Sequence, residues 1–83
     1  MTDLAMQKYI HADPKISFGK PIFRGTRLAI YFVLELLEAG VKPEEIVGPD
    51  YYPNLNLKHV QAALHYAARL AQNQLTIALD KSR

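Results

Sequence analysis

The clearest pattern in the chain is a run of apolar residues at helical spacing that begins at residue 30. Its apolar positions follow the three- and four-residue spacing of one buried helical face: Ile30, Val33, Leu34 and Leu37. Gly40 follows the run, and a glycine just beyond the last turn is a frequent helix terminator. The pattern predicts a helix over 30–39. Phe32 and Leu36 form a second apolar side, so this helix is central in the fold or exposes a surface that something covers.

A second, short helix is expected a few residues later. Pro43 suits the first position of a helix, and Glu44 and Glu45 favour the positive end of the helix dipole. These residues predict a helix over 43–47, which Gly48 and the proline after it should end.

The third helix is the longest, and it should begin after Asn56 and reach about residue 73. Asn56 is a favourable N-terminal cap, and Leu55 before it is expected to pack on Val60 as a hydrophobic staple. At about 100° per residue, the apolar side chains gather on one face: Leu57, Val60, Ala63, Leu64, Ala67 and Ala71. The polar side chains gather on another: Lys58, Gln61, His65, Arg69 and Gln72. We expect the first face to be buried and the second to be exposed.

Residues 1–29 carry signals of extended structure instead. Short β-branched and aromatic runs predict a β-hairpin with arms at 16–18 and 22–24 and a turn near Gly19 and Lys20. Residues 9–11 could add a short strand. After a turn at Gly25, the segment 26–30 is expected to run extended, with Leu28 and Ile30 on one face.

The predicted architecture is therefore a single domain over 1–83 of mostly α class. It consists of a β-hairpin element (1–29), a bundle of three helices that includes a helix-turn-helix (30–73), and a C-terminal tail (74–83). A chain of 83 residues buries only about 60–65% of its unfolded surface, so a partner or a second copy would stabilise it.

Composition narrows the setting of the protein. The chain has no cysteine, which excludes disulfides and thiolate metal sites and suits a reducing cytoplasm. No apolar run approaches a membrane span, and the N-terminus lacks a signal-peptide pattern, so we expect a cytoplasmic protein. The net charge is +2, with basic excess at both ends and an acidic excess in the middle. Such asymmetry can attract a polyanion or align two copies head to tail.

No catalytic constellation is evident. His59 and His65 are six helical positions apart and project away from one another, so they cannot share a metal ion. Only Ser17 and Ser82 offer a serine hydroxyl, with no identifiable base and orienting group. The two glycines near Lys20 do not form a phosphate loop, because Thr26 and not lysine follows the second glycine. We expect neither an enzyme nor a bound cofactor or metal.

The polar face of the long helix is the one group of residues for which the sequence suggests a function, which is DNA binding. A short helix, a connection and a longer helix form the plan of a helix-turn-helix, whose second helix enters the major groove. The candidate DNA-binding residues on the long helix are Lys58, Gln61, His65 and Arg69. The basic residues of the hairpin are a second candidate set: Lys20, Arg24 and Arg27. Any amphipathic surface helix has a polar face, so a purely solvated surface is the alternative.

An ordered series of short segments spans about residues 9–68: Gly19-Lys20-Pro21, Arg24-Gly25-Thr26-Arg27, Leu36-Leu37-Glu38-Ala39-Gly40, Pro43-Glu44-Glu45-Ile46, Tyr52-Pro53-Asn54-Leu55 and Ala62-Ala63-Leu64-His65-Tyr66-Ala67. In this order and spacing the chain resembles the bacterial family filed as domain of unknown function 433, which is grouped with VapB-like antitoxins. The resemblance implies a small homeodomain-like helical fold with an N-terminal β element and a role beside a PIN-domain ribonuclease toxin. The chain departs from the family pattern at two helix starts. Lys42 stands where a capping Ser or Thr is common, and residues 28–30 lack the proline often found there.

Two functions of different kinds follow. The first is an antitoxin-like component of a toxin–antitoxin pair, which binds a PIN-type ribonuclease toxin and, as a second ligand, promoter DNA through the helix-turn-helix. The second is a homodimeric protein-interaction module without nucleic-acid binding. A homodimer is expected because the hairpin carries more apolar residues than so thin an element can bury: Ile16, Phe18, Ile22 and Phe23.

The tail is the candidate arm for a protein partner. Leu75, Ile77 and Leu79 alternate with smaller or polar residues, a pattern that a solvated tail does not need. The tail is expected either to fold back on its own domain or to dock on the toxin as a strand or a helix.

Overall fold

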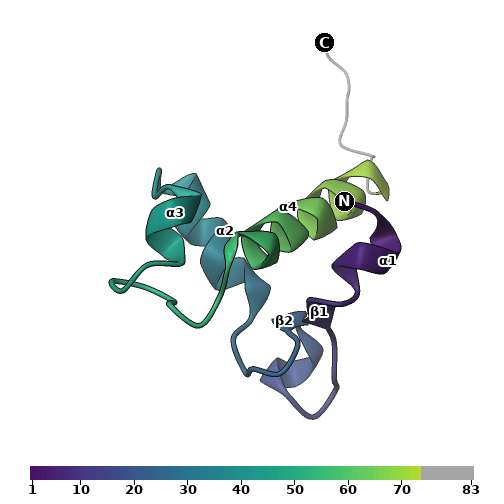
Figure 1. Cartoon of the computed structure of the whole chain (residues 1–83). Helices are drawn as coiled ribbons and strands as arrows, with labels where there is room; N and C mark the ends of the chain where they lie inside the picture. Colours follow the sequence, from purple (N-terminus) through teal and green to yellow (C-terminus); the bar gives the residue numbers. More distant parts are fainter. Residues whose placement is uncertain (74–83) are drawn as a thin grey trace.

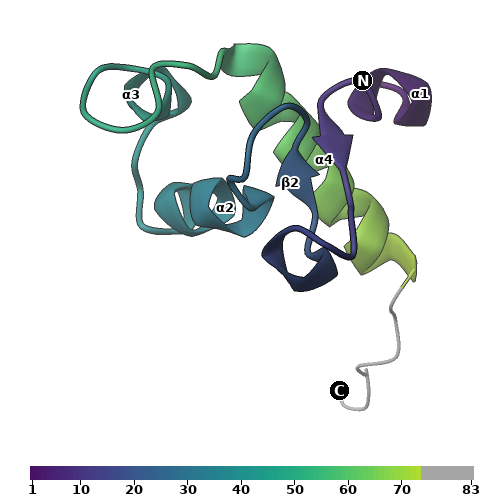
Figure 2. The same ribbon diagram turned by 90° about the horizontal axis from the view of Figure 1, so that it is seen from below.

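Helix α4 (Leu57–Asn73) is the axis of the fold, because each of the other α-helices packs against it or against a helix that does (Figure 1). The computed structural model describes residues 1–73, about half of which are helical. The other helices of this part are α1 (Asp3–Met6), α2 (Ile30–Glu38) and α3 (Pro43–Ile46). Helix α3 lies toward the start of α4 and α1 toward its end (Figure 1), and the view from below shows α2 and α3 on one side of α4 and α1 on the other (Figure 2).

Helix α2 confirms the prediction for residues 30–39, including its end. Gly40 has φ of +93°, and its N–H donates to the carbonyl of Leu37 at 3.0 Å. The N–H of Val41 donates to the carbonyl of Leu36 at 3.0 Å, which completes a Schellman motif. Glycine is favoured at this position because the left-handed conformation carries no Cβ penalty there.

Helix α3 is also confirmed, and its start shows how the chain replaces the missing capping hydroxyl. The Lys42 N–H donates to Oε1 of Glu45 at 3.0 Å, which is the acidic half of a capping box. Pro43 occupies the first helical turn, where its lack of an N–H costs no hydrogen bond.

The predicted hairpin is wrong in one arm. β2 (Ile22–Phe23) is a strand, but its antiparallel partner is β1 (Ile10–His11), with Ile10 opposite Phe23. The segment expected as the first arm forms a 3₁₀ turn, η1 (Ser17–Gly19). The two strands form a β-ribbon, called the ribbon below, and the residues paired in it are more than ten positions apart in sequence.

The connection between the two strands is a series of tight turns, which is why residues 16–18 cannot form a strand. Asp13 begins it, because its carboxylate accepts from the Lys15 N–H at 2.8 Å. Ser17 and Phe18 then adopt φ of 52° and 56°, a left-handed conformation incompatible with an extended strand. These local hydrogen bonds and backbone angles override the strand propensity of the apolar residues.

The extended run predicted over 26–30 is interrupted by a turn. The Thr26 hydroxyl donates to the Phe23 carbonyl at 2.7 Å and accepts from the Leu28 N–H at 3.0 Å. Ala29 then bridges to Ile22, and α2 begins at the next residue. The turn directs the chain from the ribbon into the first long helix.

The core lies between α4, α2, α3 and the ribbon, and it contains side chains from each of them: Ile10, Phe23, Ile30, Val33, Ile46, Leu55, Val60, Ala62 and Ala63. Leu55 and Val60 both belong to this core, as the predicted staple requires. No helix among residues 1–73 is long and apolar enough to cross a membrane.

The buried face of α4 differs from the predicted one. Ala62 is fully buried, whereas Leu57 and Leu64, expected in the core, are 49% and 48% exposed. The cause is the N-terminal segment, because the rings of Tyr9 and Phe23 stand edge-on to His59 at centroid distances of 5.1 and 5.6 Å. The ribbon thus covers a side of α4 that the helical pattern alone would leave in solvent.

Candidate interaction surfaces

The first turn of α4 is held by a reciprocal pair of hydrogen bonds between two side chains and the backbone. The Asn56 side-chain oxygen accepts from the N–H groups of Lys58 and His59 at 2.8 and 3.3 Å. In return, Nδ1 of His59 accepts from the Asn56 N–H at 3.0 Å. The arrangement is a capping box in which histidine takes the usual place of Glu or Gln. It confirms Asn56 as the cap and fixes the direction in which the helix presents its polar residues.

Burial lowers the pKa of His59 below its ordinary value of 6.5. Protonation would also turn Nδ1 from an acceptor into a donor and so break the bond from Asn56. The folded state therefore disfavours protonation of His59. The contribution of the neutral imidazole to the free energy of unfolding is fully present above pH 6.5 and is lost as the pH falls through the pKa of His59 in the folded protein.

We therefore expect the free energy of unfolding to be constant from about pH 8 to about pH 6.5 and to fall below that, toward about pH 5, by up to about 1 kcal/mol for the cap. The control is His59→Gln, because glutamine can still accept from the Asn56 N–H and does not titrate. Urea denaturation of both proteins across this range measures the effect. Equal pH dependence in the two proteins would contradict it.

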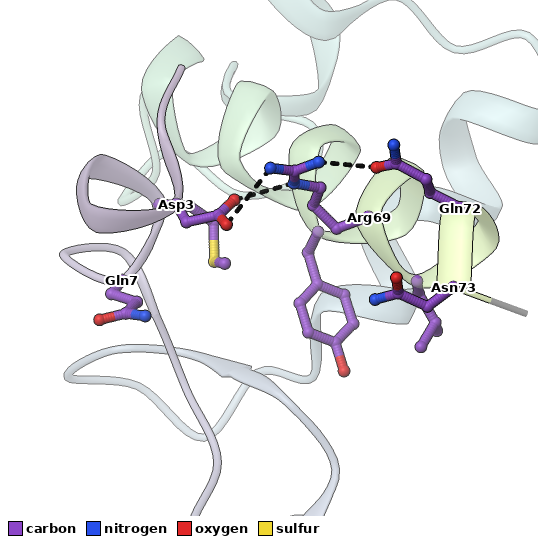
Figure 3. Close-up of a pocket in the computed structure, with 8 residues that line it drawn as sticks. Asp3, Gln7, Arg69, Gln72 and Asn73 are labelled. Carbon is purple, nitrogen blue, oxygen red and sulfur yellow. Dashed lines mark hydrogen bonds and ion pairs between the residues drawn. The ribbon is translucent and has the colours of Figure 1, made fainter.

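The four candidate DNA-binding residues on α4 separate into two pairs. Lys58 and Gln61, in the first half of the helix, are exposed, and among the residues described their side chains make no hydrogen bond or ion pair. His65 and Arg69, in the second half, are engaged by Asp3 of α1. Figure 3 shows the contact between Asp3 and Arg69. The structure therefore leaves only the first pair directly available to a ligand.

The carboxylate of Asp3 is the centre of this second cluster. One oxygen lies 2.7 Å from Nε2 of His65 and accepts from Nε of Arg69 at 3.0 Å, and the other accepts from Nη2 of Arg69 at 3.4 Å. Arg69 also donates to the Gln72 side chain at 2.6 Å. The hydrogen bond from Arg69, then that from His65, lowers the pKa of Asp3 below its ordinary value of 3.8. The cluster fastens α1 to α4, and solvent reaches it freely.

Asp3 lies in residues 1–8, for which the sequence pattern predicts no defined element and no functional residue. The start of α1 does carry a signal, because the Thr2 hydroxyl accepts from the Ala5 N–H at 3.0 Å as an N-terminal cap. Threonine followed by an acidic residue is a common helix start. That signal predicts a short helix but not its partner on α4.

The basic residues proposed from the hairpin also differ in their roles. Arg24 binds protein: its guanidinium donates to the Gln7 carbonyl at 3.2 and 2.9 Å and to the Ile10 carbonyl at 3.3 Å. The Lys20 ammonium lies 5.0 Å from the centre of the Tyr31 ring, a cation–π arrangement. Arg27 is exposed. The three residues therefore do not act as one basic surface.

An apolar hollow of about 400 Å³ opens where α2, α4 and the end of the ribbon connection meet. Its walls are mainly aliphatic and aromatic: Lys20, Pro21, Ile30, Tyr31, Leu34, Tyr66, Ala67, Leu70 and Ala71. Tyr31 and Leu70 at its edge are 38% and 47% exposed, and the ring of Phe32 stacks on Tyr31 at 4.5 Å. The second apolar side predicted for residues 30–39 is thus partly open to solvent.

Phe18 is the most exposed large apolar residue of residues 1–73, at 98%. Its φ of 56° and the φ of 52° at Ser17 place two successive residues in the left-handed region, at a cost of about 1–3 kcal/mol each. The turn is held by the Gly19 and Lys20 N–H groups, which donate to the carbonyls of Ile16 and Ser17 at 3.0 Å. A strained turn that holds an aromatic ring in water is typical of a binding site.

The last two predictions concern the partner-binding tail and metal binding. The candidate partner-binding residues Leu75, Ile77 and Leu79 lie outside the described residues. Within residues 1–73, no group of three or more metal-ligating side chains is close enough to hold an ion.

Together, the fold and these surfaces define a small helical domain with a two-stranded β-ribbon and exposed apolar and basic surfaces. The chain belongs to the family described as "Protein of unknown function (DUF433)", whose model matches residues 10–67. The match confirms the family inferred from the ordered motifs, and it includes Phe18 and His65 but neither Asp3 nor Arg69. No curated protein and no solved structure matches the chain significantly.

Proposed function

We propose that this protein is an antitoxin-like component of a bacterial toxin–antitoxin pair, which binds a PIN-type ribonuclease toxin and, through α3 and α4, promoter DNA. The match to the family model over residues 10–67 supports the proposal, because the resemblance to this family implies a grouping with VapB-like antitoxins. The observation that carries the DNA contact is the start of α4. There Lys58 and Gln61 are exposed on a helix whose opposite side is anchored in the core by Val60 and Ala63.

This arrangement suits base and phosphate contact for a physical reason. A recognition helix must be rigid, and its first turns must protrude from the domain. Asn56 and His59 fix the first turn of α4, and Gln61 and Lys58 are side chains that can pair with adenine and with guanine or phosphate. The connection from α3 to α4 spans residues 47–56 and is longer than the turn of the usual helix-turn-helix.

Salt dependence tests the DNA contact. Fluorescence anisotropy with duplex DNA from the region upstream of the gene should show affinity falling linearly on a log–log plot as salt rises. Lys58→Ala should flatten the slope by about 0.9, the value for one phosphate contact. Lys8→Ala is the matched control, because Lys8 is an exposed lysine between α1 and the ribbon and should leave the slope unchanged. An affinity that does not depend on salt would contradict the proposal.

Asp3→Asn extends the same titration to the second half of α4. Loss of the carboxylate charge weakens the hold on Arg69 and His65, which then become available to phosphate. We expect tighter binding and a slope steeper by about 0.9 for each additional phosphate that the protein neutralises. An unchanged slope would restrict the DNA surface to the start of the helix.

The toxin is the second proposed partner, and the tail residues Leu75, Ile77 and Leu79 are the proposed arm that meets it. Co-purification with the product of the neighbouring reading frame tests this pairing, and so does cleavage of RNA by that product with and without this chain. If the two proteins do not co-purify and this chain does not change the cleavage of RNA, the proposed binding of a toxin is wrong, whatever the result of the DNA titration.

A homodimeric protein-interaction module without nucleic-acid binding is the second candidate function. Asp3 already engages two of the four residues proposed for DNA on α4, and Arg24 is engaged by the backbone. Two of the four apolar residues first predicted to form a dimer are unavailable, because Ile22 and Phe23 are 1% and 0% exposed. A dimer must therefore use the exposed part of this segment, at Phe18, or another surface.

A further inference from the structure

We propose that two copies of this chain associate through a reciprocal contact, in which Phe18 of each copy enters the apolar hollow of the other. This inference rests on the homodimer of the second candidate function, and it identifies the surface. It requires neither DNA nor a toxin. Three observations carry it: the exposure of Phe18, the hollow beside it, and the short stretch of chain that joins them.

Among residues 1–73, no side chain covers the protruding ring of Phe18. It is 98% exposed although a hollow of suitable chemistry lies nearby. The backbone of the turn around it is fixed by hydrogen bonds from Gly19 and Lys20, so the position from which the ring projects is fixed. Its natural cover is therefore another molecule.

The hollow is the matching recess. Its volume of about 400 Å³ is ample for a phenyl ring, and among residues 1–73 Lys20 is the only charged residue that lines it. The aliphatic part of Lys20 and its cation–π contact with Tyr31 extend the apolar wall toward the turn that bears Phe18. An aromatic ring placed here would be covered by α2 on one side and by Leu70 of α4 on the other.

The protrusion and the recess are joined by a short stretch of chain, and this closeness makes a second copy the fitting occupant. Phe18 is two residues from Lys20, so their Cα atoms are at most about 7.6 Å apart. A surface that combines a protrusion and a recess is self-complementary under a twofold axis, and each copy then both donates and receives a ring. Such an interface closes on itself and does not propagate into filaments.

The available area predicts a weak dimer. The exposed parts of Phe18, Tyr31, Phe32 and Leu70 together amount to about 400 Å² per copy. Twice this area lies below the roughly 1,200 Å² of stable complexes, so a dissociation constant in the micromolar range is expected.

Two variants, used separately and mixed, test the reciprocal contact. Phe18→Ala removes the protruding group, and Leu70→Glu places a charge in the recess at a position that is 47% exposed. In sedimentation equilibrium, each variant alone should raise the dissociation constant at least about tenfold, because neither homodimer keeps an intact contact. An equimolar mixture should regain part of the association, because the heterodimer keeps one ring in one unaltered hollow.

The controls separate failure of the interface from failure of the dimer. Tyr51→Ala removes an aromatic group that is 42% exposed in the loop before α4 and should leave the dissociation constant unchanged. Thermal unfolding by circular dichroism shows that each variant is folded. A wild-type protein that stays monomeric up to high micromolar concentration would overturn both the interface and the homodimer. A dimer that is insensitive to Phe18→Ala, or two weakened variants whose mixture regains nothing, would overturn the reciprocal contact and leave the homodimer standing.

Discussion

Phe23→Ala is expected to remove a large part of the stability of the protein. Phe23 is 0% exposed, and its ring packs edge-on to His59 at 5.6 Å. Truncation of a buried phenylalanine costs about 3–5 kcal/mol, through lost transfer free energy and the cavity left behind. A chain of 83 residues has a total stability of about 4–12 kcal/mol, so the loss consumes much of it. Urea denaturation followed by circular dichroism measures the change.

Phe18→Ala is the matched control for this result, because it removes the same side chain five positions earlier. Phe18 is 98% exposed, so its truncation costs no buried area and the free energy of unfolding should stay within about 0.5 kcal/mol of wild type. Phe18→Gly should be neutral or slightly stabilising, because glycine relieves the strain of a φ of 56°. A loss at position 18 comparable with the loss at position 23 would contradict the structure of this turn.

Arg24→Ala is expected to destabilise the protein by about 2 kcal/mol, which is the second largest effect. Its guanidinium connects the end of α1 to the ribbon through the carbonyls of Gln7 and Ile10. Hydrogen bonds to charged groups contribute about 1.5–3 kcal/mol each when shielded, and the partial exposure of this site reduces the sum. The free energy of unfolding from urea titration is the measurement.

The lysine variant at the same position separates structure from charge. Arg24→Lys keeps the positive charge but lacks the fork that donates to two carbonyls, so it should recover little of the lost stability. If Arg24→Ala instead kept wild-type stability and flattened the salt slope of DNA binding, the residue would be a phosphate contact. The sequence alone proposed that role, and the geometry opposes it.

The roles of these residues show where sequence-based reasoning succeeds. The helix over 30–39 ends at Gly40 as predicted, and the long helix begins at its Asn56 cap. Both predictions depend on groups within four or five positions of one another, because caps and helical periodicity are local. The family could be recognised for a similar reason, since its motifs keep a fixed order and spacing between residues 10 and 67.

The interaction surfaces were harder to predict because they depend on contacts between distant segments. Lys58 was placed correctly on an exposed face, but Arg69 meets Asp3, which is 66 positions away. The exposure of Leu64 and the burial of Ala62 likewise follow from the ribbon against His59, which no helical pattern contains. Sequence periodicity describes one helix at a time and cannot specify which side a remote segment covers.

The amino-acid sequence therefore determines the long helices of this protein, their caps and its family, because each depends on neighbours along the chain. The tertiary structure decides the pairing of β1 with β2, the capture of His65 and Arg69 by Asp3, and the exposure of Phe18. Those outcomes depend on competition between local turns and long-range packing. At residues 13–20 the hydrogen-bonded turns prevailed over strand propensity. The strand β2 pairs with the distant β1, because this pairing buries Phe23.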